Sequence, residues 1–330
     1  MEKIKDKKFY IIGLGSMGKR RIRNLLFNKI KKEHICGFDI NDNRRKEVEK
    51  EYRIRTFDNF KKGILEFCPD ALIISTPPDK HKKYFMFAVR EKMHFFTEVA
   101  TTNDGYKELI PLLDEKFIAA PSCTFRYLSA IKKINSILKK NEIGNTLAFE
   151  HYLGQYLPDW HPYEDYSTVY FAKKQTGGCK EMLPYELNWI LYIFKSEIKD
   201  IKGVHKKVSN LKISADDLYV AVVEMERGII GTVVIDLLNR TPRRTFTIIG
   251  TKGSLEWNWI DRTITISTRK KRSIVHLAKV KKIKHYNTDE SAYQDEIKDF
   301  ILSVQKKKKY PYTFKDDDKI LSALNRFLVS

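Results

Sequence analysis

Cysteine and long apolar runs are both scarce in this chain of 330 residues. Its four cysteines, Cys36, Cys68, Cys123 and Cys179, lie far apart and form no C-x-x-C pair. They therefore predict reduced thiols rather than disulfides or a zinc site. No uncharged run reaches the roughly 18 residues that suggest a membrane-spanning helix, and the charged start does not have the pattern of a secretory signal. We expect a cytoplasmic protein with no membrane partner and no metal.

Acidic residues are in deficit: 42 of them stand against 62 lysines and arginines, for a net charge of +20. Such a balance raises nucleic acid as a partner. The lysines are, however, scattered through every segment, and no basic helix with interleaved aromatic residues is present. A solvated basic surface that draws anionic substrates is the better interpretation, and no specific nucleic acid is expected.

Glycine is sparse as well, with 15 residues, but three glycines fall in the order G-x-G-x-x-G within the stretch IIGLGSMGKRRIRNL. A β-prone run precedes them and apolar residues at helical spacing follow, which predicts strand, tight turn and helix. In a dinucleotide-binding loop the first glycine makes the turn, the second admits the pyrophosphate and the third lets helix and strand pack. The predicted cofactor contacts in this loop are Gly13, Gly15, Ser16, Met17 and Gly18.

A second predicted strand, residues 34–40, carries Asp39, which lies 21 residues after Gly18. An acidic side chain at this place accepts the ribose hydroxyls and repels a 2′-phosphate, which favours NAD over NADP. The alternative is that Asp39 is a turn residue at the strand end. Arg44 and Arg45 follow closely and leave NADP open.

Alternating strand and helix signals continue to about residue 122, with strands over 70–76, 94–100 and 116–122 and a helix over 81–92. The pattern predicts a doubly wound α/β domain with a parallel sheet, a Rossmann domain, over residues 1–122. Ligands of such domains bind beyond the carboxyl ends of the strands.

Residues 123–330 change in character. Runs of β-forming residues over 218–238 and 243–259 are broken by glycine turns, which indicates antiparallel hairpins. Helical segments are predicted over 125–140, 292–305 and 318–328. We expect an α+β domain for substrate binding and oligomerisation, built on a large, mainly antiparallel open sheet. The C-terminal helix is allowed to pack back on the first domain.

These motifs together resemble the glucose–fructose oxidoreductase, inositol dehydrogenase and MocA family of sugar oxidoreductases. The resemblance rests on the glycine loop, on STPPDKH (75–81), on HFFTEVA (94–100) at the place of the family's E-K-P segment, on the glycine pair 177–178 and on GTKGSLEW (250–257). Two further stretches, QYLPDWHPYEDY (155–166) and YQDEIKDF (293–300), are similar to a branch found in surface-polysaccharide and acidic-sugar pathways.

The resemblance implies an NAD(P)-dependent oxidoreductase that moves a hydride between the nicotinamide and a carbon of a sugar, a sugar nucleotide or a cyclitol. NAD is the expected cofactor. Beyond the glycine loop and Asp39, the implied cofactor contacts are Ser75, Thr76, Pro77, His81 and Glu98.

The chain departs from the family in the residues that handle the hydroxyl proton. Val99 replaces the family's lysine, Met182 its aspartate and Tyr185 its histidine, and the branch's later aspartate is Asn188. The departures sustain an alternative function: a member that binds a dinucleotide and a sugar without turnover.

Two residues are predicted to carry the proton chemistry. Tyr185 shares a helix face with Glu181 and Asn188, and either relays the proton or simply packs at a domain interface. His161 lies in a loop rich in carboxylates and aromatic rings, which suits sugar binding. The predicted substrate contacts are Arg126, Asp159, Trp160, Tyr166, Asn188 and Arg240, of which the two arginines have surface ion pairing as their alternative role. Self-association as a homodimer or homotetramer is expected through the C-terminal sheet.

Overall fold

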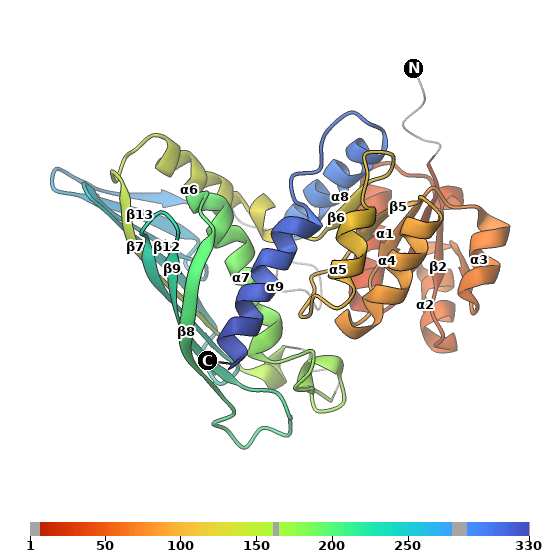
Figure 1. Ribbon diagram of the computed structural model, residues 1–330, viewed down its shortest axis with the longest axis horizontal. Helices are drawn as coiled ribbons and strands as arrows, with labels where there is room; N and C mark the ends of the chain where they lie inside the picture. Colours follow the sequence, from red (N-terminus) through yellow and green to blue (C-terminus); the bar gives the residue numbers. More distant parts are fainter. Residues whose placement is uncertain (1–6, 161–164, 279–288, 330) are drawn as a thin grey trace. The chain divides into compact units, whose positions relative to one another are not determined.

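The buried side chains form two separate cores in the computed structural model, which describes residues 7–160, 165–278 and 289–329. The chain divides into a first unit, Met1–Thr124 with Ser291–Asp318, and a second unit, Phe125–Glu290 with Lys319–Ser330. The sequence predicts a boundary after residue 122, with the C-terminal helix allowed to pack back on the first domain. The structure adds residues 291–318 to the first unit (Figure 1).

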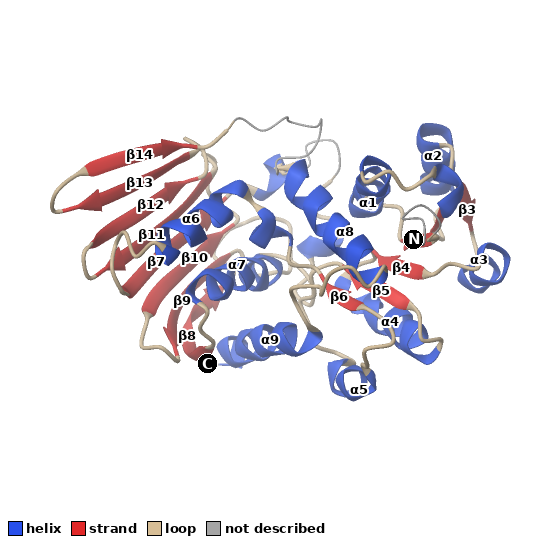
Figure 2. Ribbon diagram, turned by 90° about the horizontal axis from the view of Figure 1, so that it is seen from above, coloured by secondary structure: helices blue, strands red, loops and turns tan. Residues whose placement is uncertain are grey.

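The first unit is built on a six-stranded parallel sheet in the order β3-β2-β1-β4-β5-β6 (Figure 2). Its strands are β1 (Phe9–Ile12), β2 (Ile35–Phe38), β3 (Arg55–Phe57), β4 (Ala71–Ile74), β5 (His94–Thr97) and β6 (Ala119–Pro121). Its helices are α1 (Ser16–Phe27), α2 (Asp42–Tyr52), α3 (Phe60–Phe67), α4 (His81–Arg90), α5 (Tyr106–Leu109) and α8 (Glu290–Val304).

Helices cover both faces of this sheet. Neighbouring residues of a strand point to opposite faces, so each strand contacts helices on both sides. On β1, Phe9 packs edge-on against Phe300 of α8 at 6.4 Å, whereas Tyr10 stacks on Phe60 of α3 at 5.9 Å. All four residues of β1 are buried. The doubly wound parallel sheet predicted from the sequence is confirmed.

The second unit is built on an eight-stranded sheet in the order β14-β13-β12-β11-β7-β10-β9-β8 (Figure 2). Its strands are β7 (Thr146–Gly154), β8 (Ile198–Lys206), β9 (Leu218–Met225), β10 (Ile230–Asp236), β11 (Arg243–Gly250), β12 (Gly253–Asn258), β13 (Thr263–Thr268) and β14 (Arg272–His276). Strands β7 and β10 pair in parallel, and every other pairing is antiparallel. The predicted open, mainly antiparallel sheet is confirmed.

One face of this sheet is covered by α6 (Ser129–Lys139), α7 (Cys179–Phe194) and the later turns of α9 (Phe314–Val329). Trp189 of α7 packs on Phe246 of β11 at 4.7 Å, and Phe327 of α9 packs on Tyr219 of β9 at 5.2 Å. Burial alternates along β9, which leaves the opposite face open. Exposed apolar side chains of the strands are Leu147, Val204, Val220, Val222, Ile230, Ile249 and Ile274.

The cysteines are free thiols: Cys36, Cys123 and Cys179 are buried and Cys68 is exposed. Within the described residues, no helix combines the length and the apolar character needed to cross a membrane.

Candidate active site

The glycine loop joins β1 to α1, and two of its glycines are required by close packing. Gly13 has a φ of +91°, and a Cβ atom there would lie 2.7 Å from the carbonyl oxygen of Ser75. A Cβ atom on Gly18 would lie 1.9 Å from the carbonyl oxygen of Gly13. Real contacts of this kind do not occur, so these two positions keep the loop tight and α1 close to the sheet.

Gly15 differs, because its side of the loop is open. The nearest atoms to a Cβ atom built there are those of the Arg44 guanidinium, at 3.9 Å. Gly15 is also the N-cap of α1 and offers no side-chain cap to the first N–H groups of the helix. Beside this turn, the hydroxyl of Thr76 is buried without a hydrogen-bond partner in the described structure. Open space, a helix N-terminus that receives no side-chain cap from Gly15, and a hydroxyl without a partner among the described residues together fit the pyrophosphate of a dinucleotide.

Asp39 follows β2 and is buried, with 6% of its surface exposed. Its carboxylate accepts the backbone N–H groups of Leu14 and Asn41, each at 2.8 Å. The turn role weighed from the sequence is therefore in place, and it holds the carboxylate beside the glycine loop. Each carboxylate oxygen has a further acceptor site, so the ribose role stays a prediction. The Arg44 guanidinium lies 3.6 Å from the same carboxylate.

His81 opens α4 and is buried with both ring nitrogens occupied. Its Nε2 lies 2.8 Å from the carbonyl oxygen of Thr76, and its Nδ1 lies 3.2 Å from the hydroxyl of Thr97. Burial lowers the pKa of the imidazole, which keeps it neutral. The histidine thus joins the segment after β4 to the end of β5, and it positions Ser75, Thr76 and Pro77 at the carboxyl edge of the sheet.

Arg21 is a central residue that the sequence analysis missed. Its guanidinium is fully buried and binds the Glu98 carboxylate through two hydrogen bonds, of 2.6 and 2.7 Å. A third bond, of 2.9 Å, reaches Glu296 on α8. Glu98 also accepts the hydroxyl of Ser75 at 3.2 Å. The Glu98 carboxylate is therefore engaged by side chains of its own unit, and its predicted contact with the cofactor stays a prediction.

In the second unit, α7 begins directly after the glycine pair 177–178. Its Tyr185 ring packs edge-on against Phe125 at 4.6 Å. One turn later, Asn188 accepts a hydrogen bond of 2.8 Å from Nε of Arg126. Three predicted site residues, Tyr185, Asn188 and Arg126, are therefore gathered at one face of this helix.

A buried charge cluster lies next to these residues and was not foreseen. Arg244 of β11 lies over the rings of Phe125 and Trp259, each at 4.8 Å, and donates a 2.7 Å hydrogen bond to Glu186 of α7. Burial alone raises the pKa of Glu186, but Arg244 and the adjacent His151 bring that pKa below its ordinary value. The cluster places a permanent cation one ring away from Tyr185.

Glu181 lies in the first turn of α7, where the sequence analysis gave it no role. It accepts the hydroxyl of Tyr170 at 2.7 Å. Burial raises the pKa of Glu181 to about 7, while the hydrogen bond from Tyr170 acts in the opposite direction. A carboxyl group that titrates near neutral pH is suited to proton exchange.

The remaining predicted substrate residues follow β7 or β10. Trp160 packs on Phe171 at 5.6 Å, and the Tyr166 hydroxyl accepts the backbone N–H of Lys212 at 3.4 Å. Arg240 lies 4.0 Å over the Tyr156 ring and donates to its hydroxyl at 3.1 Å. The other two predicted residues of this region are Asp159, which is exposed, and His161, which lies outside the described residues.

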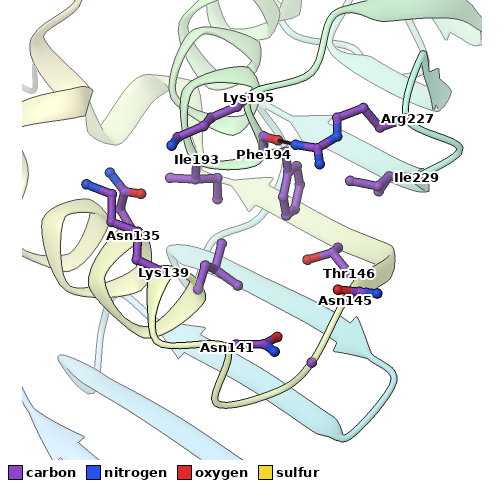
Figure 3. A pocket seen from close by; sticks show the side chains of 12 residues that line it. Asn135, Lys139, Asn141, Asn145, Thr146, Ile193, Phe194, Lys195, Arg227 and Ile229 are labelled. Atoms are coloured by element: carbon purple, nitrogen blue, oxygen red, sulfur yellow. Dashed lines mark hydrogen bonds between the residues drawn. The ribbon is translucent and has the colours of Figure 1, made fainter.

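A pocket of about 430 Å³ lies at the far end of α7, where this helix and α6 terminate (Figure 3). Lys139, Lys195 and Arg227 line it together with asparagine and apolar side chains. Its described lining includes none of the predicted site residues. Phe194, which lines the pocket, is nine residues from Tyr185, about 13 Å along a helix.

Comparisons with known proteins point to one family. The family model described as oxidoreductase family, NAD-binding Rossmann fold, matches residues 7–117, and the model of the GFO/IDH/MocA C-terminal domain matches residues 131–256. Among curated proteins, the glucose-6-phosphate 3-dehydrogenase of Bacillus subtilis (strain 168) is 22% identical over 222 residues, which are 64% of this chain and 60% of that protein. The chain thus spans about 60% of the length of this relative.

Two solved structures show the same fold over nearly the whole chain. The UDP-N-acetylglucosamine 3-dehydrogenase of Acidithiobacillus ferrooxidans is 19% identical, with a TM-score of 0.77 over 98% of this chain and 96% of that one. The myo-inositol 2-dehydrogenase of Lactobacillus plantarum is 18% identical, with a TM-score of 0.80 over 98% of both chains.

The glycine loop yields a prediction that separates binding from folding. Gly15→Ala adds a methyl group in open space at an ordinary φ of −70°, so we expect an unchanged melting temperature. The methyl group occupies the path of the pyrophosphate and should weaken NAD binding at least about tenfold, or about 1.4 kcal/mol, in calorimetry.

Gly18→Ala is the matched control, because its methyl group meets the Gly13 carbonyl at 1.9 Å. We expect it to destabilise the fold by about 1–3 kcal/mol. Undiminished NAD binding by Gly15→Ala would remove the loop from the cofactor site.

Proposed function

Because this chain belongs to the GFO/IDH/MocA oxidoreductase family, we propose that it moves a hydride between a nicotinamide cofactor and a carbinol carbon of a sugar or nucleotide sugar. The observation that carries this proposal is the open, uncapped Gly15 turn at the start of α1. The relatives named above are dehydrogenases of a sugar phosphate, a nucleotide sugar and a cyclitol, which supports the substrate class.

NAD, when bound, supplies the two-electron acceptor for oxidation of the alcohol. In our proposal the first N–H groups of α1 hold the pyrophosphate, and Asp39 accepts the ribose hydroxyls. Ser75, Thr76 and Pro77 follow the carboxyl end of β4. The buried Thr76 hydroxyl, which has no hydrogen-bond partner among the described residues, is free to bond to the cofactor. Asp39 favours NAD, while the exposed Arg44 beside it leaves NADP as a second cofactor.

We assign substrate binding to the second unit. Arg126 and Arg240 supply guanidinium groups that suit a phosphate or carboxylate of the substrate. Trp160 and Tyr166 offer rings to the apolar face of a pyranose, and Asp159 offers a carboxylate to its hydroxyls. The net charge of +20 favours anionic substrates over neutral ones.

The proton of the substrate hydroxyl needs a carrier, because Val99 replaces the family's lysine. We propose that Tyr185 makes this contact, with His161 as a further substrate-binding group. A tyrosine of ordinary pKa near 10 relays a proton more readily beside a cation, and Arg244 lies over the Phe125 ring that Tyr185 contacts. The alternative function is a member that binds dinucleotide and sugar without turnover.

We also propose that the protein works in the cytoplasm as a homodimer or homotetramer. The free state of all four cysteines supports a reducing compartment. The open face of the second sheet, with exposed Val204, Val220 and Val222 on neighbouring strands, supports association through this face.

The acid–base assignment predicts a split between rate and binding. Tyr185→Phe should lower kcat at least tenfold at unchanged NAD affinity, because general acid–base help is worth about 10²–10⁴-fold. His161→Ala should chiefly raise the substrate KM. Steady-state kinetics at 340 nm with sugar phosphates and nucleotide sugars measure both effects, and Tyr192→Phe, two turns along the same helix, serves as a control that keeps kcat.

A silent Tyr185→Phe combined with an inactive His161→Ala would reverse the two roles. If none of the sugars is oxidised or reduced although NAD binds, the protein binds without turnover and the oxidoreductase proposal fails.

A lysine introduced on the open face of the second sheet tests whether this face is the association surface. Val222→Lys puts a cation on the open sheet face and should convert the oligomer to a monomer in analytical ultracentrifugation, because an unpaired buried charge is costly at an interface. Leu65→Lys changes another exposed apolar residue, on α3 of the first unit, and should leave the assembly intact. An oligomer that survives Val222→Lys would place the interface elsewhere.

A further inference from the structure

Glu181 is a half-buried residue with a solvent-shielded carboxylate oxygen, and the reaction proposed above gives it no role. Its Oε1 accepts the Tyr170 hydroxyl at 2.7 Å. Its Oε2 is shielded from solvent and has no hydrogen-bond partner in the described part of the chain. Leaving a buried carboxylate oxygen unsatisfied is costly. Such a group is therefore retained where a proton or a ligand completes its bonding at some stage.

The position of Glu181 suggests which stage this is. It lies in the first turn of α7, next to Met182, which replaces the acidic residue of the family. Glu181 and Tyr185 are four residues apart, so their side chains are neighbours on the helix surface. We propose that Glu181 is the terminal proton acceptor of the reaction: it takes up, through Tyr185, the proton that leaves the substrate hydroxyl. This inference rests on the proposed function.

The exchange balances without a further reactant. During oxidation the carbinol C–H bond breaks and its hydride passes to oxidised NAD, while the C–O bond becomes a carbonyl. The hydroxyl proton passes to the Tyr185 oxygen as the Tyr185 proton passes to the Glu181 carboxylate. Reduction of the ketone runs through the same transfers in reverse. Glu181 thus acts through Tyr185 as a positioning and proton-storing residue.

The surroundings of Glu181 set its pKa near neutral pH, where a carboxyl group can both accept and release a proton. Burial raises its pKa to about 7. Among the described residues, Tyr170 of the short helix Tyr170–Ala172 is the titratable group that contacts Glu181, and its hydrogen bond lowers the pKa. Lys180, the adjacent cation on α7, has its own pKa lowered by burial. The carboxyl group therefore exchanges a proton close to neutral pH.

The pH dependence of kcat tests the inference. For sugar oxidation by the wild-type protein, kcat should rise with pH through a limb near 7, because the ionised carboxylate is the acceptor. Glu181→Gln should remove this limb and lower kcat at least tenfold at unchanged NAD affinity. Glu181→Asp keeps the acid and should restore a limb.

Tyr170→Phe is the second variant, and it should shift the same limb of the pH profile of kcat. It removes the hydrogen bond that lowers the Glu181 pKa, so the limb should move to higher pH while the plateau kcat is retained. A purely structural role for Glu181 would lower kcat equally at all pH values in the glutamine variant and leave the limb in place. That result overturns the inference while the oxidoreductase function stands.

Stability provides a readout that needs no turnover. Because the folded-state pKa lies above the ordinary value of 4.5, the wild-type protein should lose stability as pH rises from about 4.5 to about 7. Glu181→Gln should lack this part of the pH dependence in urea unfolding. Identical stability profiles contradict the inference. A wild-type protein that binds NAD but turns over no sugar overturns the proposed function, and this inference with it.

Discussion

The buried Arg21 guanidinium is the interaction on which the first unit depends. It joins three elements that are far apart in sequence: α1 after the glycine loop, the end of β5 through Glu98, and α8 through Glu296. Glu296 in turn accepts the backbone N–H of Cys123 at 2.6 Å and the hydroxyls of Ser122 and Thr124. Breaking one partner of such a buried cluster costs about 3–5 kcal/mol, because it leaves an uncompensated charge. Together with ring contacts such as that of Phe9 with Phe300, this cluster ties α8 to the first unit.

The predicted cofactor contacts of the first unit and the proposed proton-handling residues of the second unit are held in place in different ways. The cofactor half relies on backbone groups and on buried residues with fixed partners, such as His81 and Glu98, so it tolerates little change. The proposed proton-handling residues are instead side chains of α7 and of the elements packed on it. In our proposal, Tyr185, the Arg244 cation and Glu181 compensate for the loss of the family's lysine at Val99.

The sequence predicted what depends on local pattern. The glycine spacing, the strand periodicity and the hairpin turns identified both sheets and the glycine loop between β1 and α1. Long-range partners were missed, because burial of a charged residue depends on segments distant in sequence. Arg20 and Arg21 are adjacent in the chain, and no local pattern indicates that Arg21 is the one that binds Glu98 and Glu296. Glu181 was seen on the Tyr185 face, but its burial against Tyr170 follows from the fold of the preceding segment. Strands β7, β8, β13 and β14 also escaped notice, since their polar outer faces weaken the apolar signal.

The central claim is that this chain transfers a hydride despite its altered proton-handling residues. The most direct test uses reduced NAD labelled with deuterium at C4, on one face or the other, and a panel of keto sugars and keto nucleotide sugars. Mass spectrometry of the products follows the label. Our account predicts that one of the two labelled cofactors places a single deuterium on the carbinol carbon of an anionic sugar product. Binding of NAD with no label transferred from either face to any ketone would contradict it.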